Sequence, residues 1–160
     1  MIRETEFNDY KQIIAILKNI QNAGDSYYFL DLSDEELLAY WTHSKYQSFV
    51  YEINKKIAGS YIIGANGDGR FAHIANASYI VSADFRGQGI GKLLCKHSIE
   101  LAKSQGYKAI QFNRVVSTNL AAVTLWQSLG FKIIGTVKNG FNHKQLGLVD
   151  FYIMYRDLKN

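Results

Sequence analysis

The sequence contains a single cysteine, Cys95, and none of its apolar runs approaches the ~20 residues that a helix needs to cross a bilayer. Cys95 cannot form a disulfide within the chain, and the N-terminus opens on the charged residues Arg3, Glu4 and Glu6. Because structural disulfides mark oxidising compartments and an apolar leader marks secretion, we expect a cytoplasmic protein with neither a signal peptide nor a membrane helix. Cys95 is expected to be a core residue.

The chain also lacks a dense tract of like charge. Its 18 Lys and Arg residues exceed its 14 Asp and Glu residues, but the basic residues are scattered along the sequence. A nucleic-acid surface needs basic residues gathered on one face, so we expect no nucleic-acid partner, and no membrane partner either. A cofactor that carries several phosphates would suit the same modest positive charge.

Length and composition are those of an ordinary globular protein. The chain has 160 residues, of which 48% are hydrophobic and 20% are charged, with no repeat and no low-complexity segment. A chain of this size buries enough surface to fold without a metal or a disulfide. We therefore expect one enzyme-sized domain that spans residues 1–160.

The first half of the chain predicts a strand, two helices and an antiparallel meander. A strand is expected at 2–7, and apolar residues then recur at helical spacing between 13 and 20. Ser33 with Glu36 three residues later forms a capping-box pattern, which predicts a short second helix. The meander strands are expected at 47–53, 57–63 and 73–81, with turns at 54–56 and 66–69.

The second half predicts alternating helices and strands. These are a helix from near Arg86 to Gly106, a strand at 109–115, a helix from Asn119 to Gly130, a strand at 133–137, a polar loop at 138–147 and a strand at 149–155. This order predicts an α/β fold with a mixed central sheet of about seven strands flanked by helices. Its middle βαβα portion should contain parallel strands.

The segment from Val81 to Lys92 carries the strongest functional signal, because a strand there runs through a glycine-rich turn into a helix. Such a turn exposes backbone N–H groups at the positive end of the helix dipole, where phosphate oxygens bind. The P-loop pattern fails, because Leu93 stands where its hydroxyl residue is required. The glycines alternate as G-x-G-x-G, which also disfavours the dinucleotide fingerprint. A helix start without any ligand remains the alternative.

The turn instead has the pattern R-x-x-G-x-G at Arg86, Gly89 and Gly91, and it resembles the [RQ]-x-x-G-x-[GA] motif of the GNAT acetyltransferases. Residues 119–131, NLAAVTLWQSLGF, are similar to the family's N-x-x-A-x-x-x-Y-x-x-x-G-F helix. The two motifs stand in the family's order. The resemblance implies a single-domain GNAT fold and an N-acetyltransferase that uses acetyl-CoA as cosubstrate and no metal.

The resemblance also implies where acetyl-CoA binds. The strand end at Tyr79, Ile80 and Val81 would pair with the pantetheine arm and offer a backbone N–H to the thioester carbonyl. Asn119 would contact the same arm, although it could instead serve only as a helix cap. The pyrophosphate would lie in a cradle formed by Arg86, Gly87, Gln88, Gly89, Ile90, Gly91 and Lys92.

The chain departs from the family at Trp126, where many members have a tyrosine that protonates the departing thiolate. An indole N–H does not titrate usefully, so we expect Trp126 to be a packing residue. The strand 73–82 contains no carboxylate to act as a base, and His73 at its start is only a weak candidate. The chemistry still requires the amine to lose a proton.

A further resemblance is to the fungal proline-analogue (azetidine-2-carboxylate) acetyltransferases. They have a strand similar to Phe112-Asn113 and use asparagines in catalysis rather than a tyrosine. By position this implies catalytic roles for Asn76, Asn113 and Asn119, with Asn76 also orienting the substrate. The alternative is that Asn76 and Asn113 are structural residues at a strand edge. We expect direct transfer in a ternary complex, without an acetyl-cysteine intermediate.

The acceptor is expected to be a primary or secondary amine of a small molecule such as an amino acid. Tyr27 and Tyr28 lie in the connection that lines the acceptor site in relatives, which suggests a partly aromatic pocket, although they could simply pack in the core. Acetylation of a protein N-terminus or lysine is the alternative acceptor, and a non-catalytic acyl-CoA sensor is the alternative function. A homodimer is possible, since dimers are common among relatives.

Overall fold

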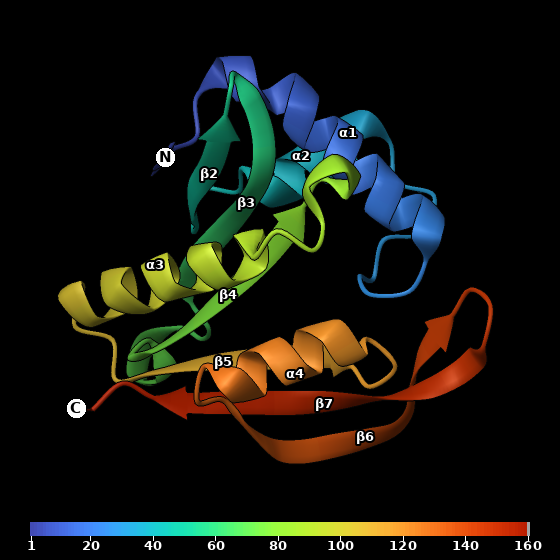
Figure 1. Cartoon of the computed structure of the whole chain (residues 1–160). Coiled ribbons are helices and arrows are strands. Elements are labelled where there is room, and N and C mark those ends of the chain that lie inside the picture. Colours follow the sequence, from blue (N-terminus) through green and yellow to red (C-terminus); the bar gives the residue numbers. More distant parts are fainter. Residues whose placement is uncertain (160) are drawn as a thin grey trace.

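Seven strands form one mixed sheet in the computed structural model, which describes residues 1–159 (Figure 1). The strands lie in the order β1-β2-β3-β4-β5-β7-β6, and β4 and β5 are parallel while the other neighbours are antiparallel. The predicted α/β fold and the parallel middle pair are confirmed. The strands are β1 (Ile2–Glu4), β2 (Gln47–Ile53), β3 (Lys56–Ala65), β4 (Ile74–Val81), β5 (Ala109–Val116), β6 (Lys132–His143) and β7 (Gly147–Asp157).

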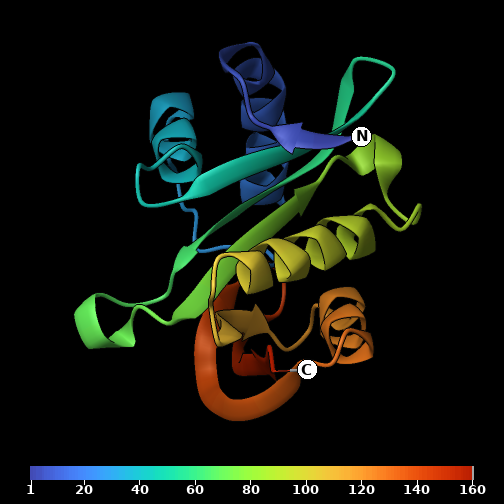
Figure 2. The ribbon, with the colours of Figure 1, turned by 90° about the vertical axis from the view of Figure 1, so that its left-hand side faces the viewer.

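Four α-helices cover the two faces of the sheet (Figure 2). Side chains alternate along a strand, so Ile62 of β3 packs toward one pair of helices while Tyr61 and Ile63 pack toward the other. No helix within residues 1–159 is long and apolar enough to cross a membrane. Helices α1 (Tyr10–Ala23) and α2 (Asp34–Trp41) share one core, and α3 (Ile90–Ser104) and α4 (Leu120–Ser128) share the other.

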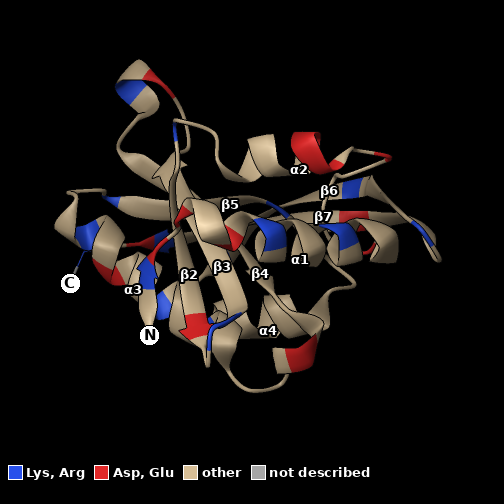
Figure 3. Ribbon diagram, turned by 90° about the horizontal axis from the view of Figure 1, so that it is seen from above, with Lys and Arg blue, Asp and Glu red and all other residues tan. Residues whose placement is uncertain are grey.

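Lys and Arg, and Asp and Glu, are spread over many helices, strands and connections of the ribbon (Figure 3). Positions of both signs occur along the same elements, and neither sign is confined to one part of the ribbon in this view. This agrees with the scattered distribution of Lys and Arg along the sequence.

Local backbone and capping contacts determine where helices α2 and α3 begin. The predicted capping box before α2 is present, because the Ser33 hydroxyl accepts from the Glu36 N–H and the Glu36 carboxylate accepts from the Ser33 N–H. Helix α3 begins at Ile90, later than the predicted start near Arg86. Gly87 and Gly89 have φ angles of +75° and +76°, which belong to the left-handed region and cannot continue a right-handed helix.

The first strand is shorter than the predicted range 2–7 and ends at Glu4. The Asp9 carboxylate accepts from both terminal nitrogens of Arg3, at 2.8 and 2.9 Å, and this ion pair holds a 3₁₀ turn at Phe7–Asp9 where the strand was expected to continue. The Arg3 guanidinium keeps the pKa of Asp9 below its usual value. The tertiary ion pair, rather than the apolar alternation, therefore sets the strand's end.

The predicted loop at 138–147 is wrong, because β6 runs on to His143 and turns directly into β7 at Gly147. The hairpin projects beyond the sheet and is largely exposed, so its strands carry polar residues and lack the apolar alternation that identifies a half-buried strand (Figure 1). A bulge near Asn139 interrupts the pairing, and the Asp150 carboxylate fixes it by accepting from the Asn139 N–H at 3.0 Å.

The tip of this hairpin returns to the N-terminal helices. The Lys144 N–H donates to the Gly24 carbonyl at 3.0 Å, and the Lys144 ammonium donates to the Asn22 carbonyl at 2.8 Å. These bonds satisfy carbonyls at the C-terminal end of α1, where a positive charge is favourable. The connection between α1 and α2 and the β6–β7 hairpin therefore lie side by side.

Strands β4 and β5 pair only at their first residues, Ile74 with Ala109 and Ala75 with Ile110, and then diverge (Figure 1). Beyond Ala75 the edge of β4 has no strand beside it on this side. Backbone donors on a strand edge of this kind remain available to an extended ligand. The opening between β4 and β5 is therefore the first part of the candidate site.

Candidate active site

Alternate residues of β4 direct their backbone N–H and C=O groups toward its open edge. The Ile74 carbonyl accepts from the Asn66 N–H on the β3 side, whereas the His73 carbonyl accepts from the Lys108 N–H on the β5 side. Because backbone groups alternate in direction along a strand, Tyr79 and Val81 direct theirs into the opening. Ile80 directs its backbone toward β3, and its buried side chain joins the α1 core.

Tyr27 contacts β4 from the connection between α1 and α2. Its hydroxyl donates to the Tyr79 carbonyl at 2.8 Å, and its ring stacks on Phe29 with 5.1 Å between centroids. Burial raises the pKa of both Tyr27 and Tyr79, so both phenols stay protonated at neutral pH. This bond leaves the Tyr79 N–H as the free polar group of that residue in the opening.

The glycine turn follows directly on this edge and supplies a cradle of amides. No heavy atom lies within 4 Å of where a Cβ would stand at Gly87 or Gly89, so the space above the turn is open. The Leu93 N–H makes the first helical bond, to the Gly89 carbonyl, which leaves the earlier N–H groups of α3 without intrahelical acceptors. These donors, at the positive end of a 15-residue helix, fit a pyrophosphate.

The predicted asparagines separate into two places. Asn76 and Asn113 lie together, because both side-chain amides donate to the side-chain oxygen Oδ1 of Asn66, at 3.2 and 2.7 Å. Gln111 donates to the Asn113 side chain at 3.0 Å, which completes a polar cluster where β4 and β5 begin to diverge. Asn119 lies outside the cluster and caps α4 by accepting from the Ala122 N–H at 3.3 Å.

Asn66 and Gln111 were not identified from the sequence. Asn66 belongs to a segment whose glycines predict only a turn. Asparagine is common in turns because its side chain bonds to the nearby backbone, so nothing in the sequence marks Asn66 as a site residue. A signal for Gln111 did exist, because residues two apart on a strand share a face and Gln111 and Asn113 are so placed.

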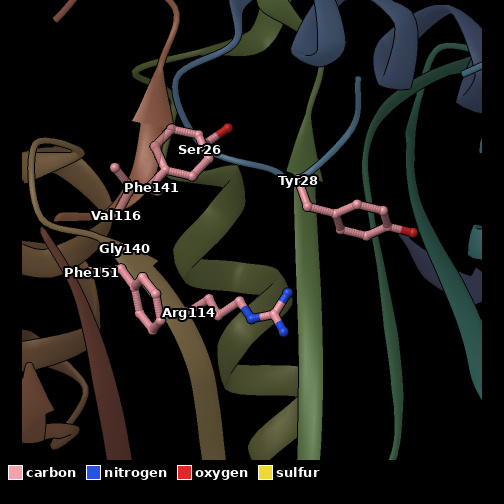
Figure 4. Close-up of a pocket in the computed structure, with 7 residues that line it drawn as sticks. All are labelled: Ser26, Tyr28, Arg114, Val116, Gly140, Phe141 and Phe151. Carbon is pink, nitrogen blue, oxygen red and sulfur yellow. The ribbon is translucent and has the colours of Figure 1, made fainter. Parts of the chain in front are cut away.

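A pocket of about 280 Å³ opens between the α1–α2 connection, β5 and the β6–β7 hairpin (Figure 4). Tyr28 lines it and is 54% exposed, whereas Phe29 is buried in the core. Arg114 is the only charged residue of the lining. The sequence interpretation missed Arg114 and the hairpin residues, the latter because it predicts a loop at 138–147. The lining consists of Ser26, Tyr28, Arg114, Val116, Gly140, Phe141 and Phe151.

Comparison with known proteins identifies this arrangement. The model of the acetyltransferase (GNAT) family matches residues 14–131, which include the open β4 edge, the glycine turn and α4. The chain belongs to the GNAT acetyltransferase family. Acetyl-CoA is the cosubstrate of this family, and the open β4 edge with the glycine turn fits it.

Individual GNAT relatives agree over much or all of the chain. An N-acetyltransferase, aca1, of Schizosaccharomyces pombe is 36% identical over 98 residues, 61% of this chain, but the match spans only 47% of that relative. A GCN5-related N-acetyltransferase from Kribbella flavida is 38% identical, with a TM-score of 0.92 over 98% of this chain and 96% of that one. The fold also matches yncA of Salmonella typhimurium, solved with its cofactor acetyl-CoA, at 21% identity and a TM-score of 0.87, over 100% of this chain and 94% of that one.

Trp126, at the usual tyrosine position of the GNAT pattern, is a packing residue as predicted. It is 8% exposed, and its ring lies 4.9 Å from Tyr79 and 5.1 Å from Phe112, measured between centroids. Cys95 is fully buried, and burial raises the pKa of its thiol to about 11, which suits a core residue. The described residues contain no cluster of three or more His, Cys, Asp or Glu that could hold a metal.

Proposed function

We propose that this GNAT protein is an acetyl-CoA-dependent N-acetyltransferase that acetylates a primary or secondary amine of a small molecule by direct transfer in a ternary complex. The observation that carries the proposal is the open β4 edge that leads into the glycine turn, in a chain that also has a pocket of about 280 Å³ between the α1–α2 connection, β5 and the β6–β7 hairpin. That volume is at the small end for ligand pockets, which favours an amino acid over a protein segment.

In this proposal the backbone provides most of the acetyl-CoA site. Residues 86–92 bind the pyrophosphate through amides and the basic side chains of Arg86 and Lys92, and Asn119 contacts the pantetheine arm. Tyr79 and Val81 donate from the β4 edge, while Ile80 supports the edge from within the sheet. When bound, acetyl-CoA supplies an acetyl group activated as a thioester.

The Tyr79 N–H is the donor that stabilises negative charge developing on the thioester oxygen, because the alternation along β4 directs it into the opening. Asn76 and Asn113 orient the amine nitrogen toward the acetyl carbon, held in place through Asn66. Attack forms the C–N bond and breaks the C–S bond, and the proton lost by the amine passes through water to the leaving sulfur. Orientation of the two reactants alone can supply several kcal/mol of the barrier reduction.

Binding and turnover test this proposal in one preparation. Acetyl-CoA at about a hundred times its dissociation constant should raise the stability by ~2.7 kcal/mol and the melting temperature by roughly 5 to 11 °C. NADH and ATP serve as controls that should give no comparable shift. Thiol release with pooled amino acids should follow. A selective shift without thiol release for any amine would instead identify an acyl-CoA sensor, and release only with peptides would identify a protein acetyltransferase.

The Cys95→Ala variant should keep kcat within about twofold of the wild type, because a buried thiol with a raised pKa is not a nucleophile. Thiol release measures the rate, and circular dichroism confirms that the variant is folded. A folded variant without activity would show that transfer passes through an acetyl-cysteine, contrary to the proposed direct mechanism.

A further inference from the structure

Arg114 projects from β5 into the pocket, with its guanidinium between Phe151 and Tyr28 (Figure 4). It forms no ion pair with any acidic group in residues 1–159, and no hydrogen bond from its guanidinium is present there either. A guanidinium in a half-closed pocket needs an anion or water to satisfy its five donors. Arg114 therefore has free capacity for an anionic group that enters the pocket.

The walls around Arg114 are apolar and aromatic. Phe141 and Phe151 come from the hairpin, Val116 from β5 and Tyr28 from the α1–α2 connection, and no carboxylate lines the pocket. Arg114 itself is exposed, so water reaches its guanidinium in the pocket; an anion seated against the aromatic side chains would displace part of this water, which strengthens a charge-assisted bond. Burial raises the pKa of Tyr28 and Tyr40, and the positive charge of Arg114 partly opposes that rise.

The hairpin holds this wall in position. Gly140 packs directly against the Phe151 ring, so that no larger residue fits there, and the Asp150 carboxylate fixes the adjacent bulge through the Asn139 N–H. Asp150 is itself paired with the Lys138 ammonium at 3.0 Å, and it is not among the residues that line the pocket. The pocket is thus a shaped site with one unneutralised positive charge.

The acetyl-CoA phosphates are not the partner of this charge. The glycine turn that fits them precedes α3, which packs on the opposite face of the sheet from the α1–α2 connection. Arg114 instead follows Asn113, which lies in the cluster proposed to orient the amine, and both residues fall in the bulge between Phe112 and Val115, where the regular alternation of side chains is interrupted. An anion on Arg114 would therefore belong to the acceptor and lie close to its amine.

We propose that Arg114 binds the carboxylate of the acceptor, and that the substrate class of this enzyme is free amino acids rather than simple amines or amino acid amides. The inference rests on the proposed acetyltransferase function. A guanidinium donates two parallel bonds to a carboxylate, which fixes the substrate's orientation as well as its affinity. The aromatic wall then contacts the amino acid's side chain.

The test compares thiol release from acetyl-CoA with a pool of L-amino acids and with the matching pool of L-amino acid amides. The wild type should show a kcat/KM at least tenfold higher for the acids. The amide's amine is less basic and more of it is unprotonated at neutral pH, so amine chemistry alone would favour the amides. A preference for the acids must therefore come from the site.

Arg114→Gln should lower kcat/KM for the acids tenfold or more and leave the amides unchanged, and Arg114→Lys should fall between because an ammonium cannot form the paired bonds. The acetyl-CoA-induced thermal shift should be the same in both variants. Arg70→Gln is the matched control, since Arg70 is exposed in the turn at Gly69–Phe71 and its loss removes the same charge.

Equal rates for acids and amides in the wild type would overturn the role of Arg114 and leave the acetyltransferase function standing. Thiol release from neither pool would overturn the proposed function for amino acids, and calorimetry with the two pools in the presence of CoA then tests Arg114 separately. If the wild type binds the acids and Arg114→Gln does not, the carboxylate site is supported. If the wild type and Arg114→Gln bind the acids equally, it is refuted.

Discussion

Replacing Gly89 by alanine is expected to weaken acetyl-CoA binding about 100-fold while leaving the fold intact. Gly89 has a φ of +76° and open space where a Cβ would stand, at the N-terminus of α3. The added methyl would occupy the place proposed for a phosphate oxygen. The loss of two charge-assisted bonds costs about 3 kcal/mol, which corresponds to the stated loss of affinity.

The matched control for this change is Gly106→Ala at the other end of the same helix. Gly106 has a φ of +84° and also has no heavy atom within 4 Å of where a Cβ would stand, so alanine there meets the same backbone strain. Both variants should lose roughly 1 kcal/mol of stability, since that is the cost of a left-handed conformation for an L-residue. Only Gly89→Ala should lose the thermal shift with acetyl-CoA, and equal shifts in the two variants would show that the turn is not the phosphate site.

Replacing Trp126 by alanine is expected to lower the free energy of unfolding by about 3 to 5 kcal/mol, because it removes a large ring from a well-packed core. The ring contacts Tyr79, Phe112 and Phe131, which belong to the core beneath α3 and α4. The melting temperature should fall by roughly 6 to 20 °C for a domain of this size. Thermal unfolding followed by circular dichroism measures the change.

Trp126→Phe separates packing from chemistry at the same position. The phenyl ring keeps the aromatic contacts but has no N–H to donate, so kcat should stay within about twofold of the wild type if Trp126 only packs. A tenfold or greater fall in kcat, in a variant that melts near the wild-type temperature, would assign the indole a part in the transfer step. The same experiment thus decides how this chain works without the tyrosine that many GNAT members use.

The local signals in the sequence were sufficient for most of the sheet and for the candidate acetyl-CoA site. Capping at Ser33 and Asn119, the glycines of the turn and the meander are encoded within a few residues of one another, where backbone sterics and side-chain hydrogen bonds act alone. The two family motifs then placed the candidate cofactor site, because both lie on the same strand–helix units that the structure shows.

The errors came where polar side-chain contacts, rather than apolar periodicity, set the end of a strand. The sequence predicts strands at 133–137 and 149–155 but a loop at 138–147, because the outer part of the β6–β7 hairpin is solvated. This part is held by Asp150, which bonds the bulge at Asn139, and by Lys144, which bonds the end of α1. The predicted first strand is too long because the Arg3–Asp9 ion pair ends it. Neither feature leaves a periodic apolar pattern, and periodicity is the main signal that a single sequence offers.

The sequence by itself determined the fold class, the elements of the sheet up to α4 and the candidate turn for a pyrophosphate, because these depend on contacts between near neighbours. Only the tertiary structure decided that β4 and β5 diverge after Ala75 and that Asn76 and Asn113 both donate to the Asn66 side chain. It also decided that Arg114 faces a pocket without a counter-ion among the described residues. Each of these depends on residues that are far apart along the chain. Their distances and charges become defined only when the two halves of the sheet and the hairpin pack together.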